Sequence, residues 1–169
     1  MEILNNLEYL KKYVKNIYEK NDHAHDFMHI MRVYKNAEKI CKLEGVDKKL
    51  VLVSVLLHDI LKKTYSDKRS KSSADLSADK ATSILKKLQF SENEIVIVAE
   101  AIRNHSFTKG KTSTSIEGRI LQDADRLDAL GAVGIARVFS VSGSKNRQFY
   151  QLNDPFSCLL YTSPSPRDS

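Results

Sequence analysis

Residues 50–61 read Leu-Val-Leu-Val-Ser-Val-Leu-Leu-His-Asp-Ile-Leu, a run that is apolar on almost every side. A helix without a polar face has to lie in the middle of a protein, with other elements around it. Asp47 stands where the residue that caps the start of such a helix is expected. We therefore predict a buried central helix over 50–61, with His58 and Asp59 at its far end.

Helical periodicity continues on both sides of this run. Apolar residues recur at three- and four-residue spacings over 3–17 and 30–41, and Gly45 is a plausible stop for the second of these helices. Cys41 falls on the apolar face and is expected to be a small core residue. No internal repeat is present, and the prediction is an all-α bundle in a single domain.

The second half of the chain has the same character after a polar interruption. Residues 66–77 are rich in serine and are expected to form a loop before a short helix over 78–88. Ser91 and Glu94 have the spacing of a capping box ahead of a helix over 95–102. A last helix is expected over 116–130, and it is expected to continue through residue 138.

Composition limits the possible classes of function. The chain has 169 residues, a net charge of +6 and two cysteines, which are too few for a disulfide framework. No run approaches the ~20 apolar residues of a membrane-spanning helix, and the first residues lack the pattern of a secretory signal. We expect a cytoplasmic protein with no membrane partner. The basic excess alone permits nucleic acid, a membrane surface or a small anionic substrate.

The end of the sequence departs from this pattern. Residues 158–169 include Cys158, show no helical periodicity and are rich in proline and serine. They resemble translated adaptor sequence at the end of a truncated reading frame, which is excluded from reasoning about the fold. We expect residues 1–157 to form the domain and residues 158–169 to be a non-native or disordered tail.

Histidine and aspartate residues gather at the ends of two predicted helices. His25 and His29 are four residues apart and would share a helix face, which alone is weak evidence for a metal site. The His58-Asp59 pair would be costly at the end of an apolar helix without a partner. A buried divalent cation would satisfy the pair, and a salt bridge to Lys62 or Lys63 is the alternative.

A second acidic group lies on the predicted helix over 116–130. Asp125 neighbours its apolar face and can point inward, and Asp128, three residues on, can support it. Two histidines and two aspartates form a mixed nitrogen and oxygen set that suits Mn²⁺, Mg²⁺, Fe²⁺, Co²⁺ or Zn²⁺. Such an ion activates water for attack on phosphorus, and basic loops nearby would hold a phosphate.

The sequence resembles the HD-domain metal-dependent phosphohydrolases, in particular the subgroup that includes nucleoside-triphosphate pyrophosphohydrolases. Four strings carry the resemblance, in this order: HDFMHIMRV at 25–33, LLHDI at 56–60, AIRNHSF at 101–107 and DADRLDALGA at 123–132. The similarity runs from about Asp22 to Pro155. Four motifs in order are specific, whereas the dipeptide HD alone is not.

The resemblance implies a role for each matching residue. One divalent metal, with manganese favoured over magnesium, cobalt, iron and zinc, would be held by four ligands: His29, His58, Asp59 and Asp125. Catalysis would involve Asp59, His105 and Asp128, with Asp59 or Asp125 orienting the attacking water. His105 matches a position that binds phosphate or a second metal, and it is a candidate for the general acid. The substrate would be contacted by His25, Lys62, Arg126, Lys145 and Arg147.

Two departures from the family pattern bear on these expectations. Members with a dinuclear centre carry a histidine between the HD pair and the His105 position, where this chain offers only Asp75 and Asp79. This favours a single metal, or a weak second site. The subgroup also continues into one or two further helices beyond Pro155, so the domain is expected to lack its last helices.

The expected function is hydrolysis of a phosphate or pyrophosphate bond in a nucleotide or a related phosphorylated metabolite. The alternatives are hydrolysis of a cyclic nucleotide or a guanosine polyphosphate, and a non-catalytic module that senses nucleotides. No helix-turn-helix, zinc-finger or aromatic-platform signature is present, so no nucleic-acid partner is expected.

Overall fold

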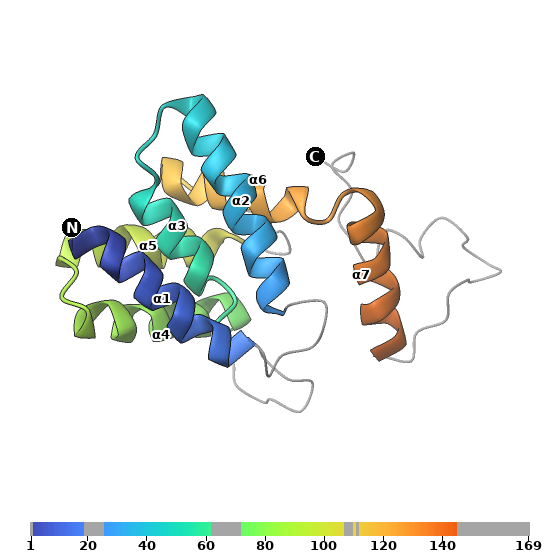
Figure 1. The fold of residues 1–169 in the computed structure, drawn as a ribbon, viewed down its shortest axis with the longest axis horizontal. Coiled ribbons are helices and arrows are strands. Elements are labelled where there is room, and N and C mark those ends of the chain that lie inside the picture. The colour runs from blue at the N-terminus through green and yellow to red at the C-terminus, as the bar shows by residue number, and fades with distance from the viewer. Residues whose placement is uncertain (1, 19–25, 62–71, 107–109, 111, 145–169) are drawn as a thin grey trace.

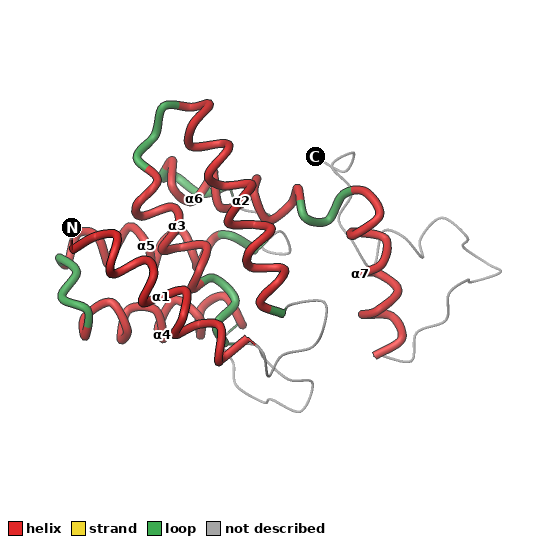
Figure 2. Tube along the Cα trace, in the orientation of Figure 1, coloured by secondary structure: helices red, strands yellow, loops and turns green. Residues whose placement is uncertain are grey.

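Every element that the structure describes is an α-helix, which confirms the predicted all-α class. The computed structural model describes residues 2–18, 26–61, 72–106, 110 and 112–144. The helices are α1 (Glu2–Tyr18), α2 (Phe27–Glu44), α3 (Lys48–Leu57), α4 (Ser73–Lys87), α5 (Glu92–Asn104), α6 (Ile116–Leu127) and α7 (Gly131–Ser144), joined by loops (Figures 1 and 2).

Helix α3 occupies the centre of the bundle, as its apolar sequence predicts. Residues 51–57 are all buried, and the helix contacts α1, α2, α4, α5 and α6 (Figure 1). The buried Ser54 hydroxyl donates to the Leu50 carbonyl at 2.8 Å, so the single polar side chain of this run is satisfied. The Tyr18 hydroxyl at the end of α1 donates to the Leu56 carbonyl at 3.3 Å, which ties α1 to α3. Cys41 is buried in the same core, as predicted.

The start of α3 is as predicted, but its end comes earlier. Asp47 is the N-cap and accepts from the Lys49 N–H, and Gly45 ends α2 in the left-handed conformation with φ of 66°. The helix stops at Leu57 rather than continuing to residue 61. The cause lies in the next residue. His58 Nδ1 donates to the Val55 carbonyl at 2.8 Å, so the side chain occupies a carbonyl that a backbone N–H would bond if the helix continued.

Two other predicted boundaries are wrong for physical reasons. Residues 73–77 belong to α4 rather than to a loop, because Ser72 and Asp75 form a capping box that starts the helix among polar residues. The helix over 116–130 does not continue through 138, since α6 ends at Leu127. Gly131 then opens α7 with φ of 67°, a left-handed conformation that breaks the helical path.

Helix α7 stands beside the bundle rather than within it. Figure 1 shows it apart from the other helices, and none of the more extensive helix–helix contacts involves it. Several of its apolar side chains are exposed, among them Val133, Ile135 and Phe139. None of the described helices combines the length and the apolar character that crossing a membrane requires.

Replacing Ser91 with alanine should destabilise the protein by about 1 kcal/mol, the typical cost of removing an N-cap hydroxyl. Ser91 Oγ accepts from the Glu94 N–H, and the Glu94 carboxylate accepts from the Ser91 N–H at 2.9 Å, so the change removes half of a capping box. Urea unfolding measures the loss. The control is Ser83→Ala, inside α4, where an exposed hydroxyl bonds only the Asp79 carbonyl. A loss at Ser83 equal to that at Ser91 would contradict the prediction.

Candidate metal centre

Three histidines from three different helices meet beneath the surface of the bundle. His29 lies in the first turn of α2, His58 follows the end of α3, and His105 follows the end of α5. All three are buried, with exposed fractions of 1%, 0% and 7%. The ring of His58 lies between the other two, with its centroid 5.7 Å from that of His29 and 5.0 Å from that of His105.

The outer nitrogen of each ring is fixed by the surrounding protein. His58 Nδ1 lies 2.8 Å from the Val55 carbonyl, and His105 Nδ1 lies 2.6 Å from the Ile102 carbonyl. A carbonyl oxygen only accepts, so both rings carry a proton on Nδ1, and in the neutral ring the lone pair is on Nε2. Both contacts join a residue to the carbonyl three positions before it at the end of a helix.

The third histidine is held by a carboxylate. His29 Nδ1 lies 2.7 Å from Asp128 Oδ2, and Asp128 also accepts from Arg32 Nε at 2.6 Å and from an Arg137 terminal nitrogen at 3.0 Å. Burial would raise the pKa of Asp128, but the hydrogen bonds from His29 and Arg32 lower it to about 2. Asp128 is therefore ionised at neutral pH and accepts from His29 Nδ1, which leaves His29 Nε2 facing Asp125.

Two carboxylates face these nitrogens. Asp125 Oδ1 lies 3.5 Å from His29 Nε2 and 4.0 Å from His58 Nε2, while Asp59 Oδ2 lies 3.8 Å from His58 Nε2. Asp59 Oδ1 is also 3.7 Å from His105 Nε2. The side chains of Asp125 and Asp59 are 28% and 16% exposed, so the centre opens to solvent on their side.

The five side chains form two overlapping groups in which the possible ligand atoms lie within 4.8 Å of one another: His29, His58 and Asp125, and His58, Asp59 and His105. Atoms that bind one divalent ion at about 2.1 Å lie about 3 to 4.2 Å apart, so these separations suit a single ion. His58 belongs to both groups. Its Nε2 has one lone pair and can bind only one ion at a time.

The buried nitrogen of His58 tests whether a metal suits the site. Its Nε2 is buried and has no hydrogen-bond partner among the described residues. An unsatisfied buried polar atom costs about 1–3 kcal/mol, so native structures rarely keep one without a reason. A cation accepts the Nε2 lone pair and removes that cost, and the facing carboxylates balance its charge. The residues present therefore fit a divalent metal ion.

His105 differs from the other two histidines in its electrostatics. Burial lowers the pKa of His105, and the neighbouring His58 lowers it further, against the opposing effect of Asp59 and Asp125. The ring is therefore neutral at neutral pH, with its proton on Nδ1 and committed to Ile102. A ring in this state accepts at Nε2 and has no proton to donate there, which disfavours the expected role of general acid in the metal-free protein.

The family model of the HD domain matches residues 26–130, which hold all five side chains of the centre. The chain belongs to the HD domain family. A relative in Bacillus subtilis, the uncharacterized protein YpgQ, is 33% identical over 154 residues, which make up 89% of this chain and 73% of YpgQ.

Solved structures of other proteins share this HD fold. The crystal structure of Bacillus subtilis YpgQ in complex with ADP matches 95% of this chain, and the match includes 78% of the YpgQ chain. The TM-score is 0.72 and the sequences are 29% identical. The structure of a predicted HD superfamily hydrolase from an uncultured Thermotogales bacterium matches 91% of this chain, and the match includes 87% of the hydrolase chain. The TM-score is 0.66 and the sequences are 34% identical. The chain thus has the fold of the HD-superfamily hydrolases, and its His/Asp groups can hold a metal.

The structure brings together only part of the site predicted from the sequence. His29, His58, Asp59, His105, Asp125 and Asp128 meet in the HD-domain centre, and Arg126 is exposed on α6. Their roles in metal binding and catalysis stay predictions. The other predicted substrate contacts lie outside the described residues: His25, Lys62, Lys145 and Arg147. Lys62 and Lys63, the alternative partners of the His58-Asp59 pair, also lie outside them.

Two arginines around Asp128 were not assigned a role from the sequence. Arg32 lies one turn after His29 on α2, so its spacing could have indicated that it reaches the same carboxylate. Arg137 lies on α7, beyond the break at Gly131, and its direction depends on how that helix is placed. No local pattern predicts Arg137.

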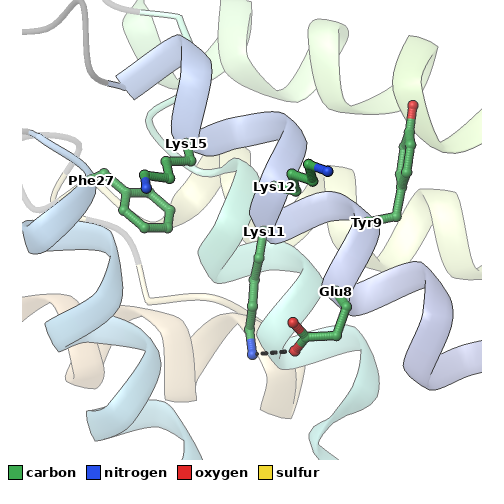
Figure 3. Close-up of a pocket in the computed structure, with 6 residues that line it drawn as sticks. All are labelled: Glu8, Tyr9, Lys11, Lys12, Lys15 and Phe27. Carbon is green, nitrogen blue, oxygen red and sulfur yellow. Dashed lines mark hydrogen bonds and ion pairs between the residues drawn. The ribbon is translucent and has the colours of Figure 1, made fainter.

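A surface hollow beside α1 is separate from this centre. It is lined by Glu8, Tyr9, Lys11, Lys12, Lys15 and Phe27, and Figure 3 shows these side chains along the outer face of α1 and at the start of α2. Lys11 pairs with Glu8 at 2.8 Å and lies over the ring of Tyr34 at 4.5 Å. No residue of the two His/Asp groups lines it. It has the character of a solvated basic helix face.

Replacing Asp128 with asparagine should weaken metal binding by 10- to 100-fold, because the group that orients His29 and fixes its tautomer loses its charge. The change keeps the size of the side chain and removes its ion pairs with Arg32 and Arg137. Isothermal titration of metal-free protein with Mn²⁺ measures the affinity. The matched control is Asp123→Asn, an exposed position on the same helix, which should bind as the wild type does.

The same variant should change the pH dependence of stability. The folded-state pKa of Asp128 is lowered from 3.8 to about 2, so its contribution is present above the unfolded pKa and is lost as pH falls toward the folded one. The stability difference between the wild type and Asp128→Asn should shrink by about 1 kcal/mol between about pH 6 and pH 3. Urea unfolding in the presence of a chelator measures it. A difference that stays constant would contradict this linkage.

Proposed function

We propose that the protein is a metal-dependent phosphohydrolase that acts on a nucleotide. The observation that carries the proposal is the buried His58 Nε2, whose lone pair faces the carboxylates and meets no donor among the described residues. A structural histidine needs no such arrangement. A ligand does, because a metal binds the deprotonated ring nitrogen.

The ligands we propose are His29, His58, Asp59 and Asp125, holding one divalent ion. The imidazoles suit Fe, Co and Zn, and the carboxylates suit Mg and Mn, so a mixed set accommodates several ions. We favour Mn²⁺, which accepts both donor types. The single lone pair of His58 argues against two ions that both use it.

The bound ion supplies Lewis acidity, which lowers the pKa of water and polarises a phosphoryl oxygen. The protein supplies the rest. Asp59 and Asp125 form the solvent-facing side of the centre, where a carboxylate oxygen can accept a proton from the attacking water. The water oxygen forms a bond to phosphorus while the bond from phosphorus to the leaving oxygen breaks. Asp128 acts through His29 as a positioning residue, since its carboxylate is buried among His29, Arg32 and Arg137.

A nucleotide is the substrate class that the comparisons favour. The solved YpgQ structure is a complex with ADP, and that relative covers most of this chain. The net charge of +6 also favours a polyanionic substrate, because it attracts phosphates over the whole surface. Whether the bond cleaved is a phosphomonoester or a pyrophosphate determines the product, so product analysis follows directly from the proposal.

Screening nucleoside mono-, di- and triphosphates with Mn²⁺, Mg²⁺ or Co²⁺ tests this function. We expect release of phosphate or pyrophosphate that depends on the ion and is greatest with Mn²⁺. Asp125→Asn should reduce the rate by more than about 100-fold, beyond the 10- to 100-fold typical of groups that only orient a ligand. Asp123→Asn, two residues away and exposed, should keep the wild-type rate.

Other outcomes would replace the proposal. Hydrolysis of a cyclic nucleotide or a guanosine polyphosphate alone would move the protein to another chemistry of the same fold. Nucleotide binding by the metal-loaded protein with no release of phosphate or pyrophosphate would indicate a sensing module. An Asp125→Asn variant with full activity would show that the site assignment is wrong.

A further inference from the structure

The buried side chain of Gln122 on α6 bridges two backbone groups that lie far from it in the sequence. Its Nε2 donates to the Asn104 carbonyl at 2.7 Å, and its Oε1 accepts from the Ser113 N–H at 3.2 Å. Gln122 is 2% exposed, so water does not replace either bond. One amide thus joins the backbone of Asn104 to that of Ser113, the residues on either side of the segment 105–112.

The first residue of that segment is His105. Asn104 is the last residue of α5, and its carbonyl is one of the groups that a helix end leaves without an intrahelical partner. The hydrogen bond from Gln122 to this carbonyl fixes the last turn of α5. The Ile102 carbonyl, which accepts from His105 Nδ1, belongs to the same turn. The position of the His105 ring therefore depends on α6 as well as on its own helix.

Gln122 and Asp125 lie three residues apart on α6, so they share one side of that helix. The same helix therefore presents the Asp125 carboxylate to His29 and His58 and fixes the turn before His105. A displacement of α6 relative to α5 would move Asp125 and His105 apart.

Further contacts hold the other end of the segment against α5 and α6. Both oxygens of Glu100 accept from Ser113 Oγ at 3.0 Å, and one accepts from Ser115 Oγ at 2.9 Å. A Cβ on Gly118 would lie 2.0 Å from Ser113 Oγ, so only glycine lets the segment approach α6 this closely. These contacts are structural and involve no residue of the metal centre.

We propose that Gln122 is a positioning residue that holds His105 at the metal centre. It does so by joining the Asn104 carbonyl at the end of α5 to the Ser113 N–H ahead of α6. The kinetic part of the inference rests on the proposed function, because it takes the centre that includes His105 as the site of hydrolysis. Glutamine suits the position because the bridge needs one donor and one acceptor on a neutral side chain. Methionine has a similar length and offers neither.

The first experiment follows the His105 ring directly and needs no activity. Long-range ¹H–¹⁵N spectra of the metal-free protein at a fixed, mildly alkaline pH should show His105 protonated at Nδ1 alone, with the signals assigned by comparison with His105→Ala. In Gln122→Met the ring should exchange between tautomers, because the turn that holds Nδ1 is released. The matched control is Leu85→Ala, which opens a cavity in the core at the last turn of α4. It should lower the melting temperature and leave the His105 signals unchanged.

The second experiment is a double-mutant cycle on kcat/KM for the nucleotide that the wild type hydrolyses. Gln122→Met should reduce kcat/KM by about 10-fold in the wild-type background, the lower end of the effect of groups around metal ligands. In the His105→Ala background it should change kcat/KM by less than about twofold, because a residue that acts through His105 has nothing left to position.

The two experiments separate the possible failures. His105 signals that are the same in Gln122→Met and the wild type, or effects on kcat/KM that multiply in the double variant, would overturn the proposal. A wild type without metal-dependent hydrolysis would refute the proposed function, while the spectra would still decide the role of Gln122. If Gln122→Met does not fold, Gln122→Glu replaces it. That variant keeps the acceptor for Ser113 and loses the donor to Asn104, so the His105 ring should exchange between tautomers in it as well.

Discussion

The hydrogen bond made by the outer nitrogen of each buried histidine is the constraint on which the centre depends. Val55, Ile102 and Asp128 each accept from one Nδ1, and the three Nε2 atoms consequently face the two overlapping groups that share His58. A free imidazole exchanges its proton between two nitrogens, whereas a ring fixed in this way presents one of them permanently. The helix ends matter for the same reason, since two of the three acceptors are carbonyls in the last turn of a helix.

The charges around Asp128 explain how a buried carboxylate is tolerated. Asp128 lies at the C-cap of α6, where the helix dipole disfavours a negative charge, and burial adds a further cost. Arg32 and Arg137 offset both effects. Arg137 comes from α7, which otherwise packs little on the bundle, so one ion pair links that helix to the ring of His29 through Asp128.

Much of the fold could be predicted because it follows from local chemistry. The apolar run of α3, the Asp47 cap and the Gly45 stop all act within a few residues, and the structure has them where the sequence indicates. Two errors arose where side chains bond to backbone in ways that periodicity does not reveal: His58 ends α3 early, and Ser72 and Asp75 start α4 early. The third arose at Gly131, whose left-handed backbone separates α7 from α6.

The site could be predicted only as a set of residues, by order along the chain. Its arrangement could not, because the contacts join distant segments. Gln122 illustrates this limit, since its partners lie 18 and 9 residues away and nothing in its neighbourhood marks it as a bridge. His29 and Asp128 are 99 residues apart, and the centre as a whole draws on α2, α3, α5 and α6. An unfolded chain therefore offers an ion only isolated, weak donors. Metal binding at the proposed site would therefore be confined to the native state, and the free ion concentration would then be a thermodynamic variable that sets the folded fraction of the protein.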